Sequence, residues 1–312
     1  MTARRSDAKK HAGEEETSSG LWRATGATAQ GAQHRREDRP NEDAFGWWPT
    51  GWDDAGNVVV AVADGHGHAR GLRAHAGASL AVDAALAVGR SRLEEPTPAS
   101  GAHHLVRHLP EELTTAWRAL VRADLSRNPL REEELAGLAA RAGAGDRRAV
   151  ESAPEVAYGT TLLVALATAR QLAIAQVGDG DILVVSSEGG TCRPLMRDAA
   201  QVANRTWSLA SSDAPARFRT ACIGDRLAAL VVLATDGYSN SFSDDVSFEQ
   251  VGPDLLDLVD GRGLDAVGES LPEWLATTSE EGSGDDVTVA LAARGPLGSR
   301  AVAGPVIGEA SS

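Results

Sequence analysis

Residues 160–187 read TTLLVALATARQLAIAQVGDGDILVVSS and contain three closely spaced apolar runs. Each run has the length and composition of a buried β-strand: TTLLVALAT (160–168), QLAIAQVGD (171–179) and DILVVSS (181–187). The breaks between them, Ala169-Arg170 and Gly180, are short enough for tight turns. The three runs are therefore predicted to pair as antiparallel hairpins.

The rest of the chain alternates strand-like and helix-like stretches. Further strands are predicted at VVVAVAD (58–64), LAALVVLATD (227–236) and DVTVALAA (286–293), and helices at 69–89, 103–126, 247–258 and 263–278. Residues 131–152 and 197–222 show no clear period. Strands and helices do not alternate strictly and several strands are hairpin neighbours, which predicts an α+β fold and not a doubly wound parallel sheet.

Composition excludes several classes of protein. The 312 residues include 30 basic and 44 acidic side chains, and the net charge of −14 argues against a nucleic-acid partner. The two cysteines, Cys192 and Cys222, exclude a disulfide scaffold and a cysteine-built zinc site. The longest apolar run, LAALVVLA (227–234), is too short to span a bilayer, and the N-terminus lacks the apolar segment of a signal peptide. A cytoplasmic protein without a membrane partner is expected.

The two ends of the chain differ from its body. Residues 1–20 have no apolar periodicity and are predicted to be disordered, and residues 295–312, rich in Gly, Pro, Ala and Ser, are predicted to form a flexible tail. Residues 21–294 are left as the folded domain.

Acidic residues recur where predicted strands end or begin. Asp64, Asp179 and Asp236 each end an apolar strand and are followed by Gly. The pairs Glu42-Asp43 and Asp285-Asp286 each lie just ahead of a strand. Two carboxylates ~4 Å apart repel by about 4 kcal/mol at a dielectric constant near 20, and Mg²⁺ or Mn²⁺ would remove that cost. Asp-Gly is also a common turn signal, so the pattern alone leaves both a metal site and ordinary turns open.

Taken together, six motifs resemble the metal-dependent protein phosphatases, the protein phosphatase 2C family, and its bacterial branch in particular. They stand in family order: RPNEDAFG (39–46), VAVADGHGHA (60–69), YGTTLLVAL (158–166), AQVGDGDILVV (175–185), VVLATDGYSN (231–240) and GSGDDVTVAL (282–291). The resemblance spans residues 26–293 and implies a four-layer α-β-β-α sandwich of two antiparallel sheets flanked by helices. Residues 21–294 would then be a phosphatase catalytic domain.

The resemblance also implies the site residues. Two Mn²⁺ or Mg²⁺ ions are expected, with Asp64 bridging them. The other implied roles are the Gly65 carbonyl and the carboxylates of Asp236 and Asp285 as ligands, Glu42 holding a metal-bound water, Asp43 orienting that group, Asp179 at a third and weaker ion, and His66 as general acid. His66 could alternatively be a loop histidine packed on the sheet rim.

The implied activity is hydrolysis of phosphoserine and phosphothreonine in proteins by direct attack of a metal-activated water. The implied partners are phosphoproteins, including a Hanks-type kinase and its substrates. Two alternatives stay open: an inactive module that binds metal or phosphoproteins, and a phosphatase of a small phosphorylated metabolite.

The sequence departs from the family pattern in three places. Asp38 stands where many members carry a phosphate-binding arginine, and Arg39 could replace it or be a solvated loop charge. The family's GDSR is here Gly178-Asp179-Gly180-Asp181, a change expected to alter the strand turn. The segment 197–222 contains Arg197, Arg205, Arg217 and Arg219, which could contact a phosphorylated partner or only solvate a loop.

Overall fold

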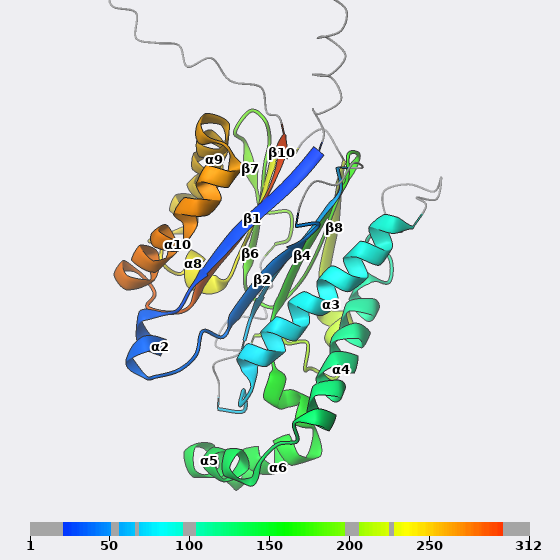
Figure 1. Cartoon of the computed structure of the whole chain (residues 1–312), viewed down its shortest axis with the longest axis vertical. Coiled ribbons are helices and arrows are strands. Elements are labelled where there is room, and N and C mark those ends of the chain that lie inside the picture. Colours follow the sequence, from blue (N-terminus) through cyan, green and yellow to red (C-terminus); the bar gives the residue numbers. More distant parts are fainter. Residues whose placement is uncertain are drawn as a thin grey trace, which may run out of the picture.

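Figure 1 shows the computed structural model of the chain. The structure describes residues 21–50, 56–65, 69–95, 104–196, 206–224 and 228–295. The segment predicted to be disordered (1–20) and the predicted tail beyond Gly295 lie outside the described residues.

Within these described ranges, ten strands form two antiparallel sheets. In the first sheet the order is β1 (Leu21–Ala29), β10 (Val287–Gly295), β9 (Leu230–Ala234), β6 (Asp181–Val185) and β7 (Thr191–Cys192). In the second sheet it is β2 (Asp43–Trp48), β3 (Val58–Asp64), β4 (Leu162–Ala167), β5 (Gln171–Val177) and β8 (Arg219–Gly224).

Helices cover the outer face of each sheet, as Figure 1 shows. α3 (Ala74–Glu94) and α4 (Leu109–Arg127) lie over the second sheet, and α9 (Asp245–Arg262) and α10 (Leu264–Glu281) over the first. The shorter elements are α2 (Ala32–Arg36), α5 (Glu132–Ala142), α6 (Ala144–Ser152), the 3₁₀ helix η2 (Pro154–Tyr158), α7 (Ala214–Arg217) and α8 (Asp236–Ser239). The predicted α+β fold of two sheets flanked by helices is confirmed. Within the described residues, no helix has the length and apolarity needed to cross a membrane.

β3 shows why the strands are apolar on both faces. Val58, Val60 and Val62 pack between the two sheets, against residues such as Val231 and Leu233 of β9. The intervening residues of β3 point the other way and belong to the core beneath α3 and α4. Because successive side chains of a strand face opposite sides, a sheet in the middle of four layers needs apolar residues at every position. The uninterrupted run at 58–63 follows from this burial.

One of the predicted hairpins is wrong. β4 and β5 do pair as neighbours, from Leu162 opposite Val177 to Ala167 opposite Leu172. β5 and β6 do not pair, because the chain leaves the second sheet after β5, and β6 pairs with β9 and β7 in the first sheet. The open edge of β5 is taken by β8. Both strands are buried on both faces, so their composition carries no sign of which sheet each one joins.

Two segments without a clear period also contain regular elements. The stretch 131–152 forms α5 and α6. The stretch 197–222 contains most of β8, whose residues are half-buried or exposed. β8 is the last strand of its sheet, and an edge strand needs no continuous apolar run to be stable. The mixture of polar and apolar residues in β8 therefore gives no clear strand signal in the sequence.

Candidate metal centre

The strand pairing brings the predicted acidic residues to one edge of the two sheets. β3 and β5 both pair antiparallel with β4, so they run in the same direction, and Asp64 and Asp179 lie at their ends. Asp43 begins β2 directly opposite Asp64. Asp236 follows β9 and Asp285 precedes β10, and these two strands are antiparallel neighbours. Acids 242 residues apart in sequence thus meet at one end of the sandwich.

Three of these carboxylates form a compact cluster. Asp64, Asp179 and Asp236 each offer one carboxylate oxygen, and these oxygens all lie within 4.8 Å of one another. The cluster joins the two sheets, since Asp236 follows a strand of the first and the other two follow strands of the second. A donor set made only of carboxylate oxygens fits Mg²⁺ or Mn²⁺, which prefer hard oxygen ligands.

Burial and mutual repulsion raise the pKa values of the clustered carboxyl groups. Burial is the largest cause for Asp64, whose pKa lies well above its usual range, and the charges of Asp43, Asp236, Asp179 and Asp285 raise it further. The pKa of Asp236 is raised to about 6, first by burial and then by Asp179 and Asp285. Carboxylates that oppose each other's ionisation in this way are stabilised by a cation between them.

Asp43 is held by two threonines, Thr235 directly after β9 and Thr288 in β10. Thr235 Oγ1 and Thr288 Oγ1 donate to Asp43 Oδ2 at 2.9 and 2.7 Å. Burial raises the pKa of Asp43 to about 8, although the Thr288 hydrogen bond opposes the rise. Among the described residues, Asp43 stands beside the three-carboxylate cluster and is not one of its members. Its predicted orienting role agrees with this placement and stays a prediction.

Glu42 and Arg39 form an ion pair at the same edge. Arg39 Nη2 donates to Glu42 Oε2 at 2.8 Å, and the Glu42 residue is only 7% exposed. Arg39 also contacts Glu37 at 3.5 Å. Arg39 therefore pairs with Glu42 at this edge, and its role toward a phosphate group stays a prediction.

Gly65 lies where the backbone leaves no room for a side chain. Its N–H donates to the Glu42 carbonyl at 3.0 Å, and it forms an isolated bridge with Thr160. A Cβ atom at this position would come within 2.7 Å of the Glu42 oxygen and of the Ala74 backbone. This close approach requires glycine. His66, the predicted general acid, lies outside the described residues.

Asp285, the remaining predicted metal ligand, is exposed, whereas its neighbour Asp286 is buried. The Asp285 side chain is 57% exposed, and among the described residues it lies outside the three-carboxylate cluster, although its charge raises the pKa of Asp236. Asp286 is 4% exposed and accepts hydrogen bonds from the Glu42 N–H at 2.6 Å and from Gly31 N–H at 2.6 Å. Sequence reasoning singled out Asp285 and missed Asp286, whose signal was only its place as the second acid of a pair.

Asp181 stands at the position of the arginine in the family's GDSR motif, and it lies beside Arg193. Arg193 Nε lies 3.6 Å from Asp181 Oδ1, and Arg193 also lies over the Phe248 ring, 5.0 Å from its centroid. Asp181 is 3% exposed and, within the described residues, is not part of the acidic cluster. Asp179 instead accepts a hydrogen bond from Thr206 Oγ1. With this altered motif, Asp179 still belongs to the acidic cluster, whereas Asp181 is buried and forms an ion pair with Arg193.

The arginines of segment 197–222 have different surroundings. Arg219 Nη2 donates to the Gly178 carbonyl at 2.8 Å and so supports the turn that carries Asp179. Arg217 stacks on Trp207, 3.7 Å from the ring centroid. Arg197 and Arg205 lie outside the described residues. A role of these arginines toward a phosphorylated partner stays a prediction.

A four-layer α-β-β-α fold with a cluster of carboxylates at the edge where both sheets end is suited to bind divalent cations. Residues 30–276 match the family model described as Protein phosphatase 2C. The match covers most of the chain, so the chain belongs to the protein phosphatase 2C family. The resemblance read from the six motifs is confirmed, and family and fold together support a metal-dependent phosphatase.

Solved structures share this fold at low sequence identity. A bacterial serine phosphatase with an arginine-to-alanine substitution is 20% identical, with a TM-score of 0.55, and the match covers 88% of this chain and 99% of that one. The serine/threonine phosphatase Stp1 from Staphylococcus aureus is 18% identical, with a TM-score of 0.57 and coverage of 88% and 95%. The catalytic domain of the serine/threonine protein phosphatase PstP, solved with two manganese ions, is 16% identical, with a TM-score of 0.53 and coverage of 88% and 98%. No curated protein matches the chain.

Proposed function

We propose that this protein is a serine/threonine protein phosphatase that hydrolyses phosphomonoesters with two divalent cations, Mn²⁺ or Mg²⁺. The observation that carries the proposal is the cluster of Asp64, Asp179 and Asp236 at the edge where both sheets end. Family membership supports the reaction class, and the two manganese ions of the related PstP structure support the number of ions.

The proposed ligands are the Asp64 carboxylate, shared between the two ions, the Gly65 carbonyl, and the carboxylates of Asp236 and Asp285, with Asp179 at a third ion. When bound, the ions supply an activated water and neutralise charge on the transferring phosphoryl group. The high pKa of Asp64 and that of about 6 for Asp236 mean that cation binding at neutral pH displaces protons from this cluster.

Two further roles are proposed from the surroundings of a side chain, and a third from its place in the sequence. Glu42 is buried and fixed by Arg39, so its carboxylate is available to orient a water at the centre. Arg39 presents a planar guanidinium that suits a phosphate group. His66 follows Asp64-Gly65 directly in sequence and would donate a proton to the leaving serine or threonine oxygen.

The proposed substrates are phosphoserine and phosphothreonine in cytoplasmic proteins, including those modified by a Hanks-type kinase. This specificity rests on family analogy, because a fold alone does not determine which phosphoester reaches the site.

The experiment that tests the proposal is hydrolysis of p-nitrophenyl phosphate by the purified protein in EDTA, Mg²⁺ or Mn²⁺. We expect turnover that needs the metal and is lost in Asp64→Asn. Asp257→Asn is the matched control, because Asp257 is an exposed acid on α9 in the outer helical layer. No turnover with any metal, from a protein that calorimetry shows to be folded and to bind Mn²⁺, would favour an inactive binding module.

A second comparison addresses the substrate class. Phosphoserine and phosphothreonine peptides should be hydrolysed faster than small sugar phosphates at equal concentration. The reverse order would contradict protein specificity and favour a phosphatase of a small metabolite.

A further inference from the structure

We propose that Arg73 is a positioning residue that holds the Asp64-Gly65 turn at the candidate metal centre, with α5 supplying its main partner. Arg73 directly precedes α3, and α5 belongs to the stretch 131–152, which has no role in the site as derived so far. The inference rests on the proposed function, because the Asp64 carboxylate and the Gly65 carbonyl are assigned there as metal ligands.

The Arg73 guanidinium joins three elements that pack near the start of α3. Its Nε and Nη2 donate to the two carboxylate oxygens of Glu134 in α5, each at 3.0 Å. Its Nη1 donates to Tyr158 Oη in η2 at 2.7 Å, and two more N–H groups donate to the carbonyls of Asn128 and Pro129, directly after α4. All five N–H groups of the guanidinium thus have an acceptor, and the side chain is only 12% exposed.

On one side, Arg73 fixes the first residue of α3 against Gly65. Ala74 follows Arg73 directly, and a Cβ atom at Gly65 would lie 2.7 Å from the carbonyl carbon and oxygen of Ala74. The two backbones touch with no side chain between them, so Ala74 cannot move toward Gly65 without displacing it. The start of α3 has no side-chain cap, and the Arg73 N–H instead donates to the Ala157 carbonyl at 2.8 Å. The contacts of Arg73 therefore set where α3 begins.

On the other side, Arg73 supports the segment that binds the Asp64 carbonyl. Tyr158 is fully buried, and its hydroxyl accepts the Arg73 N–H. Two residues further on, Thr160 forms the bridge with Gly65, and its hydroxyl donates to the Asp64 carbonyl at 2.9 Å. Arg73 thus links the two segments that enclose the Asp64-Gly65 turn.

The direction of a backbone carbonyl matters for a metal that it binds. The Gly65 carbonyl cannot adjust by rotating a side chain, because the path of the backbone sets its direction. Removing a group that orients a metal ligand commonly weakens metal binding by about 10–100-fold. Arg73 acts through neighbouring residues and not by direct contact, so we expect a loss at the lower end of that range, about 10-fold in Mn²⁺ affinity.

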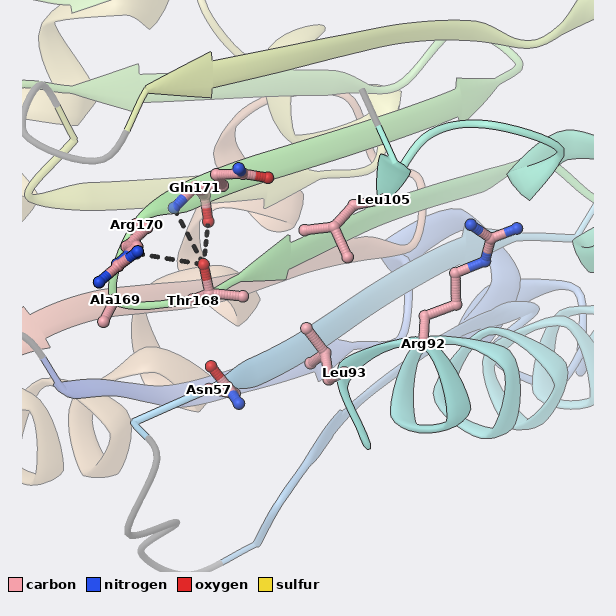
Figure 2. A pocket seen from close by; sticks show the side chains of 8 residues that line it. All are labelled: Asn57, Arg92, Leu93, Leu105, Thr168, Ala169, Arg170 and Gln171. Atoms are coloured by element: carbon pink, nitrogen blue, oxygen red, sulfur yellow. Dashed lines mark hydrogen bonds between the residues drawn. The ribbon is translucent and has the colours of Figure 1, made fainter. Parts of the chain in front are cut away.

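Arg92 offers a matched control on the same helix. It is 8% exposed, donates to the two carboxylate oxygens of Glu112 at 2.8 and 2.6 Å, and also donates to two backbone carbonyls. Figure 2 shows Arg92 lining a pocket together with Asn57, which stands directly before β3. Asp64 ends that seven-residue strand, so at about 3.3 Å per residue it lies about 20 Å from Asn57. Arg92 therefore has the same kind of partners as Arg73 at the opposite end of the sandwich.

The test compares Arg73→Lys with Arg92→Lys on the full chain. Lysine keeps the charge, but its single ammonium group cannot span two carboxylate oxygens and the backbone carbonyls at once. Both variants should therefore melt at a lower temperature in EDTA. A milder pair, Glu134→Gln and Glu112→Gln, keeps each arginine and weakens its bidentate contact.

Mn²⁺ affinity is measured by calorimetry at a temperature at which the variants are folded in EDTA. We expect Arg73→Lys to bind Mn²⁺ about 10-fold more weakly, and Glu134→Gln to show a smaller loss. Arg92→Lys and Glu112→Gln should match the unaltered protein in affinity, although Arg92→Lys also melts lower. This pattern would show that the contacts of Arg73 act on the metal centre and not only on the stability of the fold.

Two results would overturn the inference. One is an unchanged Mn²⁺ affinity in Arg73→Lys, and the other is an equal loss in Arg73→Lys and Arg92→Lys, because affinity would then follow fold stability. If Arg73→Lys does not fold, Glu134→Gln and its control Glu112→Gln decide by the same two criteria. Mn²⁺ binding by the unaltered protein separates the two proposals: without it the proposed function fails as well, and with it only the role of Arg73 is at stake.

Discussion

Replacing Asp236 by Asn should remove activity and yet stabilise the protein when no metal is present. Asp236 shares the centre with Asp64 and Asp179, with carboxylate oxygens within 4.8 Å of one another. Burial and the charges of Asp179 and Asp285 raise its pKa from 3.8 to about 6. Asn is nearly the same size, carries no charge, and can donate to the carboxylates that Asp236 repels.

The raised pKa of Asp236 gives the size and the sign of the expected change in unfolding free energy. A change in pKa from 3.8 to about 6 corresponds to about 3 kcal/mol of unfolding free energy, since one pKa unit is about 1.4 kcal/mol. Because the pKa is raised in the folded state, the stability contributed by the protonated carboxyl is fully present below pH 3.8 and is lost as the pH rises through about 6. The advantage of Asp236→Asn should therefore be absent near pH 4 and complete near pH 7.5, where it amounts to at most about 3 kcal/mol, or about 6–12 °C for a domain of this size.

Thermal unfolding in EDTA, followed by circular dichroism from pH 4 to pH 8, measures this effect. Asp257→Asn, an exposed change on α9, should show no gain that depends on pH. With Mn²⁺ at about 100 times its Kd, the unaltered protein should gain about 2.7 kcal/mol, while Asp236→Asn gains far less. The reasoning is refuted if Asp236→Asn melts lower than the unaltered protein in EDTA at pH 7.5, or if its gain is the same at pH 4 and pH 7.5.

Three further outcomes are expected. Mn²⁺ affinity, measured by calorimetry, should fall as the pH is lowered from 8 to 5, because the pKa of Asp236 is raised to about 6 and that of Asp64 lies well above its usual range, so that protons compete with the ion; an affinity independent of pH would contradict this. His66→Ala should slow hydrolysis of alkyl phosphates more than that of p-nitrophenyl phosphate, whose leaving group hardly needs a proton, and equal losses would remove the general-acid role. Arg193→Met should cost about 3 kcal/mol in urea unfolding, because it takes the cation from Asp181, which is 3% exposed; a cost below about 1 kcal/mol would show that this pair does not stabilise the fold.

The elements of the fold and the positions of the acids could be read from the sequence because their signals are local. The run VVVAVA at 58–63 is apolar at every position because both faces of its strand are buried, and Asp64-Gly65 ends it with a turn. The same construction at Asp179 and Asp236 marked the other two members of the carboxylate cluster. Each pattern reports on the burial and turn geometry of a few consecutive residues, which a single sequence contains.

The partners of those elements were decided only by the tertiary structure. β6 follows β5 after three residues and still joins the other sheet, because β8 occupies the edge of β5 and β9 offers an edge to β6. His34 and Asp286 lie 252 residues apart and meet only once α2 docks on the turn before β10. The sequence determined which residues would be buried, where strands would end, and that acids would stand at those ends. Which strands pair, and which carboxylates come within 4.8 Å of one another, depends on edges and faces supplied by distant parts of the chain, and only the assembled sandwich provides them.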